Sequence, residues 1–225
     1  MSKGLVGRKG LTAGGVLVLV VAALAGWLGN GQGGPTSLAK ADQPFDYYVL
    51  ALSWSPSFCE SRPDADQCGQ GRRFILHGLW PQFDKGYPQD CPSGEADPTN
   101  RELAQYEDLT ESRGLLAYQR RKHGRCAGVS AERYLAASRA AVEAVTIPPS
   151  LDRIARDLRV DAKLIEAAFL EANPEMDRDG VTVKCRDGRF SEVRICLTKD
   201  LALRRCGRDV VRDCRQSGLE LPAPR

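Results

Sequence analysis

Eight cysteines constrain the fold of this 225-residue chain more than any other feature, because each disulfide they form fixes two segments beside each other. All of them follow residue 41: Cys59, Cys68, Cys91, Cys126, Cys185, Cys196, Cys206 and Cys214. An even number of cysteines behind an export signal is typical of a disulfide framework. Eight cysteines allow 105 pairings, and composition does not choose among them. No C-x-x-C motif occurs and the chain has two histidines, which disfavours a metal site.

The first 41 residues differ in composition from the rest of the chain. Three basic residues precede an uncharged apolar stretch from Leu11 to Leu28, and Ala39-Lys40-Ala41 is typical of a signal-peptidase site. This order indicates a secretory signal peptide. The apolar stretch is also close to the roughly 18 residues of a spanning helix, so an uncleaved N-terminal anchor is the alternative. We expect residues 42–225 to form one exported domain, periplasmic or extracellular, which meets a membrane only if the leader stays attached.

The leader also determines the sign of the net charge. The chain holds 32 Lys and Arg against 29 Asp and Glu. Four of the basic residues and none of the acidic ones lie in residues 1–41, so the remainder has 28 against 29, a net charge of −1. A protein that binds nucleic acid by bulk neutralisation of phosphates carries a clear basic excess. Any contact with RNA is therefore expected to be local, in a groove with a few placed groups.

Local patterns beyond the leader predict a mixture of strands and helices. Residues 46–52 and 74–77 read as strands, and residues 181–185 and 193–197 alternate about a hairpin turn at Asp187-Gly188. A period of two puts Ile75 and His77 on one face of their strand. Residues 84–100, rich in Gly, Pro and Asp, are expected as loop.

Helical patterns cover residues 101–109, 112–123 and 130–145, with Ser130 as the N-cap of the third. A further helix is expected to be capped by Asp161 and to end before Pro174. Its apolar stripe is predicted to be Leu164, Ile165, Ala168 and Phe169. Hairpin strands with helices between them predict an α+β fold, with a mainly antiparallel central sheet flanked by helices in a single disulfide-linked domain.

Both histidines lie in unusual runs, Phe74-Ile75-Leu76-His77-Gly78-Leu79-Trp80-Pro81-Gln82 and Tyr118-Gln119-Arg120-Arg121-Lys122-His123-Gly124-Arg125-Cys126. One histidine beside apolar residues is most often a satisfied core or surface residue. Two imidazoles in two such runs instead suggest a general acid–base pair, because imidazole titrates near neutral pH. On a helix, Gln119, Lys122 and His123 share a face suited to a phosphate. Arg120 and Arg121 are interpreted as solvent-facing.

These two runs resemble the two signatures of the ribonuclease T2 family. The first matches its F-x-I-H-G-L-W-P pattern, and RRKHGRC matches the tail of H-E-W-x-K-H-G-T-C. Three further segments also resemble the family: Tyr47–Cys59 its opening strand, Gly86–Cys91 its G-Y-P-x-x-C segment, and Ala168–Pro174 its late helix. The resemblance runs from about Phe45 to Cys214 and implies the same α+β fold.

The resemblance implies an endoribonuclease that cleaves single-stranded RNA through 2′,3′-cyclic phosphate ends, without a metal or other cofactor. It assigns His123 as the base, His77 as the acid and Lys122 as the stabiliser of transition-state charge, with Tyr118 at a phosphate-binding position. DNA would not be cleaved, and we expect a monomer. The disulfides it implies are Cys59–Cys68, Cys91–Cys126, Cys185–Cys214 and Cys196–Cys206.

Two positions depart from the family pattern. Gln119 stands where the family has a catalytic Glu, and Arg120 replaces its Trp. A glutamine can hold neither a proton nor a charge, so a catalytically impaired, exported RNA- or partner-binding protein on the same scaffold is the alternative function. Trp80 and Tyr87 are candidates to stack on a base, with core packing as their alternative role, and Gln82 is a weaker candidate to bond a base edge. A metallonuclease is disfavoured because no carboxylate or histidine cluster has metal-ligand spacing.

Overall fold

The computed structural model describes residues 44–110, 112–212 and 214–225, all of which belong to one compact unit. The expected leader, residues 1–41, lies outside the described residues. No helix in the described ranges is long and apolar enough to cross a membrane.

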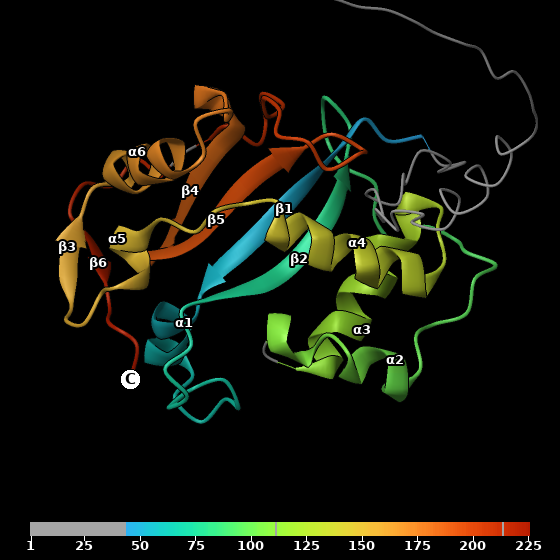
Figure 1. Ribbon diagram of the computed structural model, residues 1–225, viewed down its shortest axis with the longest axis horizontal. Coiled ribbons are helices and arrows are strands. Elements are labelled where there is room, and N and C mark those ends of the chain that lie inside the picture. The colour runs from blue at the N-terminus through green and yellow to red at the C-terminus, as the bar shows by residue number, and fades with distance from the viewer. Residues whose placement is uncertain (1–43, 111, 213) are drawn as a thin grey trace, which may run out of the picture. The chain divides into compact units, whose positions relative to one another are not determined.

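Six strands in the described part of the chain form one sheet: β1 Tyr47–Trp54, β2 Phe74–Gln82, β3 Leu158–Val160, β4 Val181–Arg186, β5 Arg189–Leu197 and β6 Leu219–Leu221. Their order is β2-β1-β5-β6-β3, and β4 pairs with β5 as well. Every pairing is antiparallel except that of β5 with β6. Figure 1 shows β1 between β2 and β5, so β1 is an inner strand of the sheet. The predicted α+β fold with a mainly antiparallel sheet is thereby confirmed.

The apolar run of β1 forms the centre of the core. Tyr48, Leu50, Leu52 and Trp54 alternate along the strand and belong to the main hydrophobic cluster, each no more than 2% exposed. The opposite face of the same strand carries Tyr47 and Val49 in a smaller cluster. A central strand covered on both faces is expected to be apolar throughout, as this one is.

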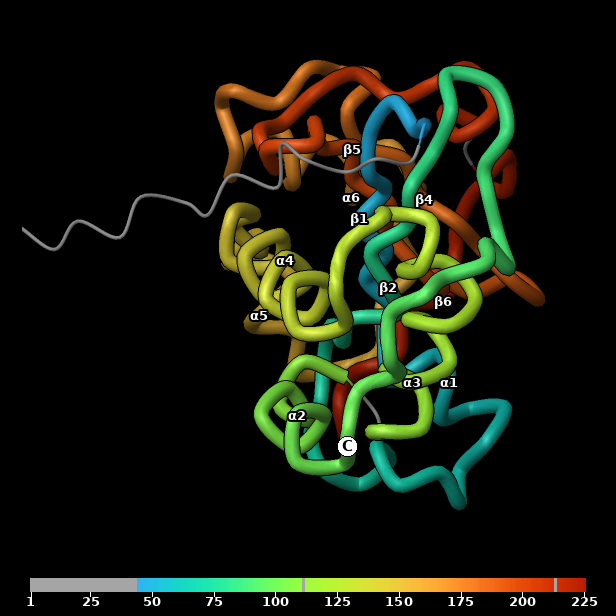
Figure 2. The backbone as a smooth tube through the Cα atoms, turned by 90° about the vertical axis from the view of Figure 1, so that its right-hand side faces the viewer, coloured from blue at the N-terminus to red at the C-terminus, as the bar shows by residue number. Residues whose placement is uncertain are grey.

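The helices gather beside two parts of the sheet: α1 Ser55–Ser61, α2 Asn100–Ala104, α3 Arg113–Lys122, α4 Ala131–Glu143, α5 Pro149–Asp152 and α6 Ala162–Ala172. In Figure 1, α3 and α4 lie next to β2 and α6 lies next to β4. Figure 2, turned by 90°, shows α4 to one side of β1 and β2. Short 3₁₀ turns lie at Glu107–Leu109, Gly124–Ala127 and Arg178–Gly180.

Helix starts are predicted better than helix lengths. Ser130 accepts a hydrogen bond from the Arg133 amide and is the N-cap of α4 as expected, and Ser112 caps α3 in the same way. The predicted helix 101–109 is broken: α2 ends at Ala104 and a separate 3₁₀ turn follows.

The predicted apolar stripe of the late helix is partly wrong. Ile165 and Phe169 are buried, but Leu164 is 63% exposed, and Ala162 takes the remaining core position. Asp161 occupies the N-cap position without a side-chain cap bond, because its carboxylate accepts the amide of Gly218 instead. The stripe therefore follows i, i+3 and i+7 from Ala162, with one residue fewer facing the sheet than expected.

Four disulfides join all eight cysteines: Cys59–Cys68, Cys91–Cys126, Cys185–Cys214 and Cys196–Cys206. These are the pairs that the family resemblance implies. The second one matters most for the site, since it ties the loop after β2 to the turn directly after α3. The two histidine motifs are thus covalently linked through their flanking segments.

Candidate active site

A bulge in β2 places two aromatic rings of the first motif on one face of the sheet. In the pairing of β1 with β2, Ala51 lies opposite Gly78 and Leu52 lies opposite Leu76, so His77 is the extra residue. His77 and Trp80 are three positions apart and would point to opposite faces of a regular strand. The extra residue shifts the register between them, and their ring centroids lie 5.1 Å apart.

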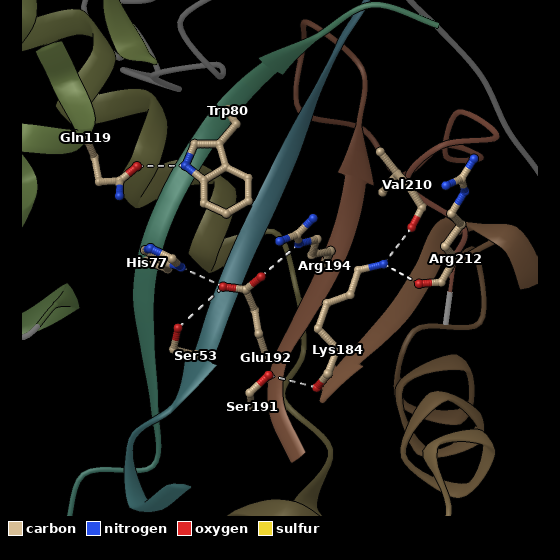
Figure 3. Close-up of polar contacts among 10 residues, drawn as sticks. All are labelled: Ser53, His77, Trp80, Gln119, Lys184, Ser191, Glu192, Arg194, Val210 and Arg212. Atoms are coloured by element: carbon tan, nitrogen blue, oxygen red, sulfur yellow. Dashed lines mark hydrogen bonds and ion pairs between the residues drawn. The ribbon is translucent and has the colours of Figure 1, made fainter. Parts of the chain in front are cut away.

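The imidazole of His77 is held by a buried carboxylate. Its Nδ1 lies 2.6 Å from Oε2 of Glu192, a residue of β5 that is 6% exposed. The other carboxylate oxygen of Glu192 accepts Nε of Arg194 at 2.7 Å. Figure 3 shows Glu192 between these two partners. Burial by itself would raise the pKa of the Glu192 carboxyl, but the bond to His77 and the charge of Arg194 hold it below its usual value.

Trp80 occupies the space between the two histidines. Its ring centroid lies 5.4 Å from that of His123 and faces the guanidinium of Arg194 at 5.0 Å. Its indole N–H donates to the side-chain oxygen of Gln119 at 2.7 Å, as Figure 3 shows. Gln119 is 4% exposed, so its side chain points into the molecule. Gln119 thus fixes the orientation of the Trp80 ring.

His123 ends α3 and lies in a very different electrostatic environment from His77. Its amide donates to the Gln119 carbonyl at 2.9 Å, which closes the last turn, while its own φ of −124° leaves the helix. The ring Nδ1 is buried without a hydrogen-bond partner. Burial, together with the positive charges of Lys122 and His77, lowers the pKa of His123 to about 4. This imidazole is therefore neutral over most of the physiological pH range.

Lys122 is already paired in this structure. Its ammonium binds the carboxylate of Asp90, a residue of the loop after β2. The Asp90 amide in turn donates to the Lys122 carbonyl at 2.8 Å, and the disulfide from Cys91 to Cys126 lies next to both residues. The bond to Asp90 raises the pKa of Lys122. Both side chains remain partly exposed, so the pair lies at the surface of the site.

The remaining predicted residues fall into two groups. Tyr118 and Tyr87 are 50% and 55% exposed, which suits a role in binding a ligand, and the Tyr87 ring lies 6.4 Å from that of His123. Gln82 is 5% exposed and its amide donates to the neighbouring Pro81 carbonyl, so the contact with a base edge stays a prediction that this structure does not support.

The interpretation of Arg120 as solvent-facing is wrong. This side chain is fully buried, and it donates to the Val129 carbonyl at 2.9 Å beside the Tyr134 ring. Arg120 thus belongs to the core, on the side of α3 that faces away from solvent. Arg121 is exposed, as predicted.

Sequence reasoning missed Glu192, Arg194 and Asp90. A signal for the first two exists in β5, where Val193, Ile195 and Leu197 alternate in the core, so that Glu192 and Arg194 share the opposite face. Burying a charged side chain in a central strand costs free energy unless the charge is paired. Two charged residues in the middle of such a strand are therefore candidates for a functional site. No local pattern distinguishes Asp90 from the other acidic residues of its loop.

A cavity of about 550 Å³ opens beside His77 and Glu192. Ser53, Ser57, Gln67, Leu115 and Lys184 are among the residues that line it. The Ser57 hydroxyl and the Gln67 amide are buried without hydrogen-bond partners. Among the described residues, no group of three or more His, Cys, Asp or Glu could hold a metal ion. Of the two imidazoles, that of His77 lines this cavity, together with polar and charged groups of β5 and the segments around it.

Comparisons with known proteins identify relatives of this chain. A ribonuclease from Aeromonas hydrophila is 40% identical over 117 residues, which cover 51% of each chain. A probable ribonuclease from Haemophilus influenzae is 35% identical over 126 residues, 48% of this chain and 46% of that protein. The chain thus spans about half the length of these curated relatives.

A solved structure, RNase NT in complex with 5′-AMP, superposes with a TM-score of 0.62 at 19% identity, over 81% of this chain and 99% of that one. At this identity the likeness shows the fold alone. The model of the Ribonuclease T2 family matches residues 45–206, which include both histidine motifs and the strand that carries Glu192. This chain therefore belongs to the ribonuclease T2 family.

Proposed function

We propose that this protein is a metal-independent endoribonuclease that cleaves single-stranded RNA and leaves 2′,3′-cyclic phosphate ends. His123 takes the proton of the 2′-hydroxyl, whose oxygen attacks the adjacent phosphorus. The bond from phosphorus to the 5′-oxygen breaks, and His77 donates a proton to that leaving oxygen. Lys122 stabilises the negative charge on the phosphorane-like transition state. DNA is not a substrate, because it has no 2′-hydroxyl.

The observation that carries this proposal is the contrast between the two imidazoles around Trp80. His123 is kept neutral by burial and by the nearby charge of Lys122, as a general base must be. His77 instead has its Nδ1 bonded to the Glu192 carboxylate, which leaves Nε2 to face the leaving oxygen.

Substrate contacts follow from the exposed groups around this pair. Tyr87 and Tyr118 are about half exposed, and the Tyr87 ring lies 6.4 Å from that of His123. Trp80 is half-buried, with Arg194 over its ring, and offers its exposed part to a base. Lys122 reaches the phosphate by exchanging its partner Asp90 for the substrate. RNA binding is local in this arrangement, consistent with the net charge of −1 outside the leader.

The proposal includes export. Residues 1–41 direct the chain out of the cytoplasm, either as a cleaved signal peptide or as an anchor, and residues 42–225 form the ribonuclease domain. Four disulfides support an oxidising compartment, periplasmic or extracellular. The N-terminal sequence of the exported protein tests this: a start at Asp42 supports cleavage, and a start at Met1 supports the anchor.

Purified protein with its disulfides formed should cleave RNA in excess EDTA, yield 2′,3′-cyclic ends and leave DNA intact. His77→Ala and His123→Ala should each lower kcat by several orders of magnitude, since each removes a proton-transfer group. Arg121→Ala, on the exposed side of α3, is the control and should cleave like wild type. RNA binding without turnover would instead favour the catalytically impaired binder, and loss of cleavage in EDTA would refute metal independence.

A further inference from the structure

We propose that Glu192 is a positioning residue for His77, which fixes the tautomer of the imidazole and stabilises its protonated form, and that Arg194 holds Glu192 in place. This inference rests on the proposed function, in which His77 is the general acid. It adds a second residue behind that acid, contributed by a different strand 115 positions further along the chain.

The geometry decides which nitrogen of His77 carries the proton. An ionised carboxylate accepts hydrogen bonds and cannot donate them. The 2.6 Å contact between Nδ1 and the Glu192 carboxylate therefore requires an N–H at Nδ1. The other nitrogen, Nε2, is then left to exchange its proton with the substrate. The partner of one ring nitrogen commonly determines the function of the other in this way.

The side chain of Glu192 is held in one orientation by its surroundings. It is 6% exposed and lies in a strand paired on both sides, with Ser53 of β1 directly opposite. One of its oxygens contacts His77 and the hydroxyl of Ser53, and the other accepts Arg194. A buried carboxylate without such partners would be strongly disfavoured as an anion. The hydrogen bonds from His77, Ser53 and Arg194 keep the Glu192 carboxylate charged, so it can stabilise a positive charge on the imidazole.

Arg194 couples this pair to the rest of the site. Its guanidinium binds Glu192 through Nε and covers the Trp80 ring at 5.0 Å. Trp80 in turn donates to Gln119, one helical turn before His123. Contacts thus connect Glu192 through Arg194 and Trp80 to Gln119, and Figure 3 shows these four residues together with His77.

The charged groups that surround His77 set the sign of the pH effect. Glu192 is negative and Arg194 positive on β5, and Lys122 and His123 lie at the end of α3. The adjoining cavity adds Lys184, Arg186, Asp187 and Arg189. Among these groups, Glu192 is the carboxylate bonded to the ring. Its removal should favour the neutral imidazole, so the alkaline limb of the pH–rate profile should move to lower pH.

The kinetic test compares wild type with Glu192→Gln and Glu192→Asp on a dinucleotide across pH. Loss of the charged partner should lower kcat about ten- to hundred-fold with little change in KM, and should shift the alkaline limb downward. Glu192→Asp keeps the charge and should recover part of kcat and the position of the limb. Glu220→Gln is the control, because Glu220 of β6 is likewise a strand glutamate paired with arginine, here Arg159 and Arg189, and its ion pairs involve no histidine.

Equal kcat values for Glu192→Gln and Glu220→Gln, or a loss with no shift of the limb, would overturn the positioning role. A second measurement does not depend on turnover. The chain has two histidines, so a ¹⁵N-histidine NMR spectrum contains two imidazoles, and His77→Gln assigns them. At high pH, wild-type His77 should be protonated at Nδ1, and Glu192→Gln should change that signal. A proton at Nε2 in wild type would overturn the inference even in an active enzyme, whereas an Nδ1 proton in an inactive one would overturn only the proposed function.

Discussion

Replacing Gln119 by Glu should make the enzyme faster. Gln119 lies one helical turn before His123, with the His123 amide bonded to its carbonyl. Its side-chain oxygen holds the Trp80 indole at 2.7 Å, and a glutamate oxygen can accept the same bond without moving. The substitution therefore keeps the shape of the site and adds one negative charge beside the proposed base.

The magnitude follows from the spacing. Side chains four apart on a helix have Cβ atoms about 5–6 Å apart. At an effective dielectric constant of about 20, a unit charge at about 6 Å stabilises the imidazolium that forms in the transition state by about 3 kcal/mol. Lys122 offsets part of this. The cost of burying the carboxylate is present in both ground and transition states, so it lowers stability more than rate. We expect kcat to rise about ten- to hundred-fold.

The assay is single-turnover cleavage of a dinucleotide by wild type and Gln119→Glu across pH. The added charge raises the pKa of His123, so the acidic limb of the profile should move to higher pH, while KM changes little. Gln105→Glu adds the same charge at an exposed glutamine of another segment and should leave the profile unchanged. An equal or lower kcat in Gln119→Glu would show that the glutamine is no handicap and that His123 does not acquire a proton in the rate-limiting step.

Four further outcomes are expected. Because burial and nearby cations lower the pKa of His123 to about 4, kcat/KM should persist into acid and decline only near that pH; a limb near 6.5 would contradict the assigned base. The unfolded chain binds this proton at higher pH than the fold does, so the free energy of unfolding should fall as pH drops from 6.5 toward 4, and His123→Phe should flatten that slope in denaturant titrations. Asp90→Asn frees the Lys122 ammonium and should raise kcat/KM about two- to fivefold on a dinucleotide; a decrease would mean that Asp90 orients the lysine. Replacing Cys91 and Cys126 by Ala should lower the free energy of unfolding by about 2–5 kcal/mol, and an unchanged denaturation midpoint would refute a structural role for this disulfide.

Local sequence was sufficient to predict the elements whose formation depends on near neighbours. The N-cap at Ser130 depends on a residue three positions further on, and the hairpin of β4 and β5 follows from Asp187-Gly188 between alternating strands. The apolar run of β1 predicts a strand buried on both faces. The two histidine motifs also identify the side chains that meet at the site, because they are distinctive in themselves.

The tertiary structure decided what those side chains contact. Glu192 reaches His77 because β1 places β5 and β2 on its two edges, and no periodicity within 189–197 reveals that register. The bulge at His77 is likewise a property of the pair of strands, and it alone brings Trp80 to the same face. The orientation predictions for Leu164 and Arg120 were wrong for the same reason: the apolar residue lies in solvent and the charged one is buried. Sequence periodicity indicates which residues share a face, whereas the pairing of strands that are distant in the sequence determines what those residues contact.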